Sequence, residues 1–140
     1  MGSSITRRDL AKLALATAAV GSSARAAAAA DPITAGGAIA AVRLAEGTLG
    51  ARELAEAALE RAGQLAHLGA FINLDPDQVR RDADRIDALR KRGGDPGPLA
   101  GVPLAVKDNI DSSALPTTAG TPALRDWRPR ADAPVLAGLL

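Results

Sequence analysis

Lys107 is the residue whose type and position first suggest chemistry. It follows the apolar run 102–106, and glycines and prolines precede that run. A short apolar run bounded by turn residues is typical of a buried strand. A lysine that loses contact with water gives up its proton more readily, and a neutral amine can serve as a general base. The position of Lys107 therefore allows acid–base chemistry.

The scarcity of lysine adds weight to this interpretation. The chain has 14 arginines and only three lysines, Lys12, Lys91 and Lys107. An arginine cannot give up its proton in a protein, so a lysine among so many arginines suggests that proton transfer is needed. Taken alone, however, the local pattern favours a lysine that reaches water from the end of a strand. The catalytic interpretation depends on the surrounding sequence.

Composition excludes several classes of site. The 140 residues are enough for one small domain, and they include no cysteine, so no disulfide or thiolate metal site can form. His67 is the single histidine, which excludes histidine-cluster metal sites and histidine-based triads within the chain, and its position is typical of a helix end. Phe71 and Trp127 are the only aromatic residues, too few for a nucleic-acid stacking surface. We expect no metal and no cofactor.

The first 30 residues are predicted to be an export signal rather than part of the fold. The pair Arg7-Arg8 precedes an apolar run at 13–20, and the small-residue tract 26–30 follows. This order is typical of a signal peptide, and the arginine pair resembles the twin-arginine type. The apolar run is short for a membrane span, so we expect no stable span. We expect the protein to be periplasmic or extracellular. An alanine-rich helix, a disordered tail and an uncleaved anchor are the alternatives.

Charge separates this leader from the body of the chain. Residues 1–30 carry a net charge of +3, and the total is +1, so the remaining residues carry −2. A mildly acidic body has no electrostatic footprint for nucleic acid, and we expect no such partner.

The body must contain the elements that position Lys107. Apolar spacing predicts helices at 33–46, 49–66 and 75–90, with Thr48 as the cap of the second. The segment 70–74 is predicted to be a strand or an extended packed segment. The glycine- and proline-rich connection 91–98 then leads into the run before Lys107.

The residues around Lys107 resemble a known family. Residues 97–110 read Gly-Pro-Leu-Ala-Gly-Val-Pro-Leu-Ala-Val-Lys-Asp-Asn-Ile, and residues 116–120 read Pro-Thr-Thr-Ala-Gly. Together they resemble the amidase signature family near its N-terminal catalytic lysine. The upstream helices, the segment 70–77 and residues 132–136 are similar to the same family, so the resemblance covers essentially everything after the leader.

The resemblance implies hydrolysis, or ammonia transfer, at a small-molecule carboxamide. The family uses a serine nucleophile, a bridging serine at a cis peptide bond, and a lysine, and Lys107 matches the lysine. Asp108 and Asn109 match the positions after it, where a supporting role is expected in holding the loop around the base. Thr117, Thr118 and Gly120 match a turn that lines the same region, without assigned substrate contacts.

The resemblance also implies an α/β fold, in which helices surround a mixed sheet. Residues 31–140 would supply the N-terminal helices and the first core strand, and would be incomplete as a domain because the serine-bearing glycine-rich stretch lies further along. After the leader, the only serines are Ser112 and Ser113, in a different context. A dyad of either serine with Lys107 satisfies the chemistry, but their loop has the composition of an ordinary connection. We therefore expect the chain to be inactive alone.

Two other functions compete with this interpretation. One is an exported helical module that binds a partner without catalysis; such a module has no reason to keep a lysine after an apolar strand. The other is a protein similar to the A subunit of the aminoacyl-tRNA amidotransferases. The predicted export signal argues against that function, because charged tRNA is cytosolic.

Overall fold

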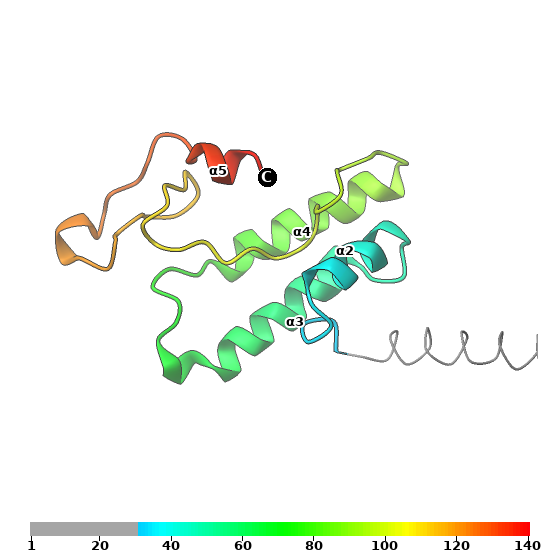
Figure 1. Ribbon diagram of the computed structural model, residues 1–140, viewed down its shortest axis with the longest axis horizontal. Coiled ribbons are helices and arrows are strands. Elements are labelled where there is room, and N and C mark those ends of the chain that lie inside the picture. Colours follow the sequence, from blue (N-terminus) through cyan, green and yellow to red (C-terminus); the bar gives the residue numbers. More distant parts are fainter. Residues whose placement is uncertain (1–30) are drawn as a thin grey trace, which may run out of the picture.

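The computed structural model describes residues 31–140, and their regular secondary structure is helical (Figure 1). The longer helices are α2 (Gly37–Ala45), α3 (Ala51–Gln64) and α4 (Pro76–Lys91). Short helical turns follow at η1 (Ala66–Leu68), η2 (Pro122–Leu124) and α5 (Pro134–Ala137). The predicted helices at 33–46, 49–66 and 75–90 are confirmed, each ending within a few residues of its predicted bounds. The predicted leader lies outside the described residues.

The first turn of α3 is capped from a distant part of the chain. The hydroxyl of Thr48, the predicted cap, instead donates to the backbone carbonyl of Arg43 at 3.2 Å. The Asp87 carboxylate of α4 accepts the backbone N–H groups of Ala51 and Arg52 at 2.8 and 3.0 Å. A carboxylate is stabilising there because the first amides of a helix are unpaired and carry a positive potential. The prediction of Thr48 as the cap is therefore wrong.

The start of α4 follows local signals that the sequence shows directly. The carboxylate of Asp75 accepts the backbone N–H of Gln78 at 2.9 Å, and Pro76 occupies the first helical position. Proline is tolerated there because its missing N–H would have had no partner within the helix. Asp77 adds a negative charge to the first turn, where the helix dipole favours it.

The core lies between α2, α3 and α4, and it is small. α3 and α4 lie side by side, and α2 packs near the start of α3 (Figure 1). Most of the buried side chains are alanine and leucine, which are good helix formers and bury little area each. They are Ala40, Leu44, Leu49, Ala51, Leu54, Ala55 and Ala83.

The stretch before Lys107 is held against this core by the close packing of Gly101 on α3 and by hydrogen bonds from Arg90. Gly101 has a φ of 91°, and a Cβ added to it would lie 2.8 Å from the Cβ of Ala51. Glycine is required there for both conformation and space. The guanidinium of Arg90 donates to the backbone carbonyls of Leu44 and Ala100 at 2.7 and 2.9 Å. These contacts hold the stretch against the helices.

The run 102–106 then leaves the core without a strand neighbour. Val102 packs against the core, but Leu104 and Val106 are 52% and 39% exposed. The segment 70–74 also forms no strand, with Phe71 and Ile72 largely exposed. The prediction of a buried strand at 102–106 is thus not confirmed within residues 31–140. A strand needs a neighbour for its backbone N–H and C=O groups, and the described helices offer none.

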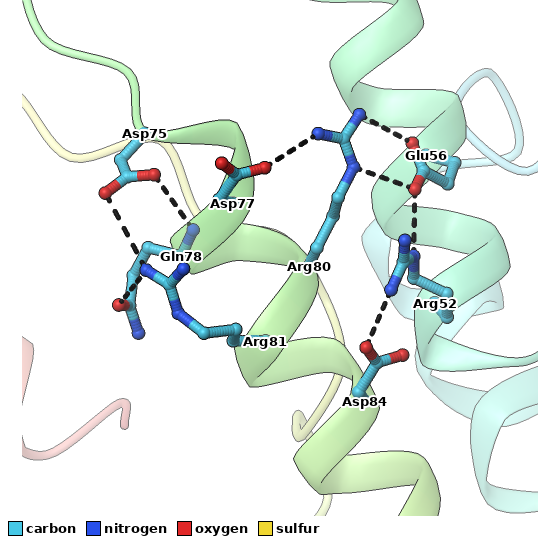
Figure 2. A network of polar contacts seen from close by, with 8 residues as sticks. All are labelled: Arg52, Glu56, Asp75, Asp77, Gln78, Arg80, Arg81 and Asp84. Atoms are coloured by element: carbon cyan, nitrogen blue, oxygen red, sulfur yellow. Dashed lines mark hydrogen bonds and ion pairs between the residues drawn. The ribbon is translucent and has the colours of Figure 1, made fainter.

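Charged side chains join the polar faces of α3 and α4 (Figure 2). Arg80 donates to both carboxylate oxygens of Glu56 at 2.9 and 3.1 Å, and Arg52 donates to Glu56 at 2.8 Å. Arg52 also reaches Asp84 at 2.7 Å, and Arg80 reaches Asp77 at 3.2 Å. Hydrogen bonds from Arg80, and then from Arg52, lower the pKa of Glu56 to about 2. The network lies on the face that the sequence pattern predicts to be solvated.

Candidate functional site

Lys107 lies in the loop that follows the run 102–106, and its side chain faces solvent. The residue is exposed, so the desolvated environment predicted for it is absent within residues 31–140. The predicted burial depended on a sheet around the run, and the described chain forms none. The backbone at Lys107 is nevertheless held, because its carbonyl accepts the N–H of Ile110 at 2.9 Å and closes a turn.

Asp108, the next residue, is held by hydrogen bonds to residues 118–120. Its carboxylate accepts the backbone N–H groups of Thr118 and Gly120 at 3.0 and 3.2 Å, and also the hydroxyl of Thr118. Its backbone carbonyl accepts the N–H of Ala119 at 2.8 Å. The N–H and hydroxyl of Thr118 are the main cause that lowers the pKa of Asp108. One aspartate thus binds three successive residues of the turn 117–120, which we call the threonine turn.

The threonine turn is buried on one side and has an unusual backbone. Thr117 and Thr118 are each only 6% exposed. Ala119 has a φ of 49° and Gly120 a φ of 69°, so two successive residues adopt the left-handed conformation. This conformation costs a non-glycine residue about 1–2 kcal/mol. The hydrogen bond from the Ala119 N–H to Asp108 helps to hold it.

Asn73 connects the site to the segment before α4. Its side-chain amide donates to the backbone carbonyl of Pro116 at 3.3 Å, just before the threonine turn. Its side chain also helps to lower the pKa of Asp108, less than Thr118 and Gly120 do. Asn73 was not among the predicted site residues. The signal that could have found it is a lone amide within the apolar segment 70–74.

The remaining predicted residues have other surroundings. Asn109 is exposed. The backbone N–H and hydroxyl of Ser113 both donate to the Asp132 carboxylate, at 2.6 and 2.9 Å. The backbone N–H of Ser112 donates to the hydroxyl of Thr117 at 3.3 Å. These hydrogen bonds hold both serines to Thr117 and Asp132, and none of them joins a serine to Lys107.

A separate apolar hollow lies against the core. Its volume is about 430 Å³, and α2, α3, Phe71 and residues 102–105 line it. Because Lys107 is not part of its lining, this hollow does not place a substrate at the lysine.

Two further findings concern metals and membranes. Among residues 31–140, no group of three or more His, Asp or Glu side chains could hold a metal ion. His67 lies in η1, at the end of the α3 region, as its position in the sequence predicts. None of the helices in the described part of the chain is both long enough and apolar enough to cross a membrane.

The sequence that carries this arrangement matches the amidase family over residues 53–140. The chain belongs to that family, and the match includes Lys107 and the threonine turn. It is 46% identical over 89 residues to mandelamide hydrolase of Pseudomonas putida, which covers 64% of this chain and 18% of that enzyme.

A second group of relatives has a different activity. The chain is 45% identical over 95 residues to the A subunit of glutamyl-tRNA(Gln) amidotransferase from Symbiobacterium thermophilum, covering 66% of this chain and 20% of that relative. The chain therefore spans about a fifth of the length of the curated relatives it matches. No solved structure shows a significant match to it.

Proposed function

We propose that this chain supplies the lysine-bearing part of an exported amidase-type hydrolase, with Lys107 as the general base. The observation that carries the proposal is the amidase-family match across a lysine whose neighbour, Asp108, binds the threonine turn. The substrate class is a small-molecule carboxamide, as the name of the mandelamide hydrolase relative suggests.

In the proposed reaction, Lys107 moves protons for a serine nucleophile. As the serine oxygen attacks the amide carbon, its proton passes through a bridging serine to the lysine amine. The proton then goes to the leaving nitrogen as the C–N bond breaks, and water hydrolyses the ester that remains. The Ser113 hydroxyl donates to Asp132, the Ser112 backbone N–H donates to Thr117, and neither bond leads to Lys107. We infer that the nucleophile comes from outside residues 31–140, and we expect these residues alone to be inactive.

The same proposal gives the run 102–106 a structural role. Val102, Leu104 and Val106 alternate along an extended segment, so their side chains fall on one face. Leu104 and Val106 are exposed where a sheet would cover them. We expect this run to become a core strand when neighbouring strands are present. Amide hydrogen exchange should then be slow at 104–106 in an assembled enzyme and fast in the isolated chain.

A hybrid enzyme tests the catalytic role of Lys107. In it, the whole 140-residue chain replaces the aligned segment of the Pseudomonas putida mandelamide hydrolase, followed by the rest of that enzyme. We expect the hybrid to hydrolyse mandelamide. Lys107→Ala and Lys107→Arg should both abolish this activity, because neither side chain can accept a proton at neutral pH.

Lys91→Ala is the matched control for this hybrid. Lys91 is also an exposed lysine, but it ends α4 in a solvated connection, so its loss should leave the rate unchanged. A hybrid that stays active with Lys107→Arg would contradict the role as a general base. Full activity with Lys107→Ala would support the non-catalytic binding module instead.

The second candidate is a function like that of the amidotransferase relative. The observation in its favour is the 45% identity to the Symbiobacterium thermophilum protein. The two functions differ in where the protein works, because charged tRNA is cytosolic. We propose export by the leader, and mass spectrometry of the mature protein should find an N-terminus near Asp31. A protein that keeps residues 1–30 in the cytosol would favour the amidotransferase function.

A further inference from the structure

The position of Lys107 depends on contacts made by its neighbour rather than by its own side chain. Lys107 is exposed, and the bonds that hold its backbone come from the 107–110 turn and from Asp108. A base on an exposed loop needs such support, because proton transfer requires its amine within hydrogen-bond distance of the reacting group. A displacement of about 1 Å can reduce a rate by about 100-fold.

Thr118 contributes most of the bonds in this support. It gives Asp108 both its backbone N–H and its hydroxyl, and the hydroxyl oxygen also accepts the N–H of Gly120 at 3.1 Å. With 6% of its surface exposed, Thr118 is shielded from competing water. Its hydroxyl therefore links the carboxylate of Asp108 to the end of the threonine turn.

Asn73 supports the threonine turn from another part of the chain. Its amide bonds the Pro116 carbonyl, so it ties the segment before α4 to the entry of the threonine turn. The turn that binds Asp108 is thereby tied to a residue that lies 43 positions before Pro116.

We propose that Thr118 and Asn73 are positioning residues: Thr118 holds Lys107 through Asp108, and Asn73 holds the threonine turn that Asp108 binds. The proposal rests on the proposed function of Lys107. It assigns no substrate contact to either residue: their effect should fall on the rate of the chemical step and leave substrate binding almost unchanged.

The hybrid enzyme described above tests this proposal with Thr118→Val, which keeps the shape of the side chain and removes its hydroxyl. We expect kcat to fall about 10- to 100-fold, with KM changing less than about twofold. Thr118→Ser keeps the hydroxyl and should restore kcat to within about threefold of the parent. Asn73→Asp, which removes the donor to the Pro116 carbonyl and replaces it with a carboxylate, should also lower kcat without raising KM.

Thr121→Val is the matched control, because the Thr121 hydroxyl only accepts the nearby N–H of Ala123 at 3.4 Å. Its activity should equal that of the parent. The proposal is overturned if Thr118→Val keeps the parental kcat, if Thr118→Ser restores nothing, or if the Thr121 control loses as much. A purely structural role would lower the amount of folded enzyme, measured by thermal unfolding, and serine would not selectively restore kcat.

The parental hybrid and its Lys107→Ala variant separate this proposal from the proposed function. If Lys107→Ala retains activity, the role of Lys107 fails. If Lys107→Ala is inactive while the Thr118 and Asn73 variants are fully active, only the positioning proposal fails.

Discussion

Lys107 and Asp108 are adjacent in the chain, yet the structure holds them in different ways. The lysine side chain extends into solvent, whereas the aspartate is bound by the threonine turn. Because these bonds lower the pKa of Asp108, its carboxylate stays ionised at neutral pH and well into the acid range. The Asp108 carboxylate can therefore accept the hydrogen bonds of the threonine turn at neutral pH.

Gly101 gives a prediction at the scale of one residue. Gly97 and Gly101 both have positive φ values, 97° and 91°, but only a Cβ at Gly101 would meet Ala51, at 2.8 Å. We expect Gly97→Ala to cost about 1 kcal/mol from backbone strain alone. Gly101→Ala adds overpacking and should cost about 2–5 kcal/mol in total. Urea unfolding of both variants provides the measurement, and equal midpoints would contradict the close approach.

At the scale of the elements, Glu56 makes the pairing of α3 and α4 sensitive to acid. Its pKa is lowered from 4.5 to about 2 in the folded protein. Between these values the unfolded chain takes up a proton that the folded chain does not, so stability falls as the pH falls. The contribution of Glu56 is complete above about pH 4.5 and lost below about pH 2.

Comparison of Glu56→Gln with the parent chain tests this dependence. The difference in unfolding midpoint should be largest near neutral pH and should shrink as the pH falls from about 5 to about 2. Glu60→Gln is the control, because Glu60 has one longer contact, with Gln64 of the same helix at 3.3 Å. A constant difference across this range would contradict the lowered pKa. Because the Glu56 network is exposed, the whole effect should be modest.

The elements that the sequence predicts are those whose signals are local. The cap and proline at the start of α4 lie within a few residues of the helix, and periodicity marks α2 and α3. The cap of α3 could not be predicted, because Asp87 is 36 residues away from Ala51. The role of Asn73 was also hidden, since its partner Pro116 is 43 residues distant. The predicted strand at 102–106 is not formed for a different reason. Its apolar pattern suits a strand, but a strand also needs a neighbouring strand to pair with.

For the whole molecule, the small core and the large exposed apolar surface predict marginal stability. The almost fully buried large side chains in residues 31–140 are four leucines, Leu44, Leu49, Leu54 and Leu136, while Phe71, Leu104 and Trp127 are about half exposed. We expect the isolated chain to unfold with a midpoint below about 45 °C. Leu54→Ala should remove the transition, since it costs about 2–5 kcal/mol. Leu104→Ala should hardly change it. A cooperative transition at high temperature would contradict this expectation.

The Asp87 cap has a consequence for how the molecule folds. The first amides of α3 find their partner only after α4 has formed and docked, so α3 gains its stable first turn late. Unfolding of the first turn of α3, or of α4 around Asp87, would therefore break the hydrogen bonds that join the two helices there. The two helices should behave as one cooperative unit, with similar protection of their amides against hydrogen exchange. The hydrogen bond from Arg90 of α4 to the Ala100 carbonyl attaches the segment that leads to Lys107 to this unit.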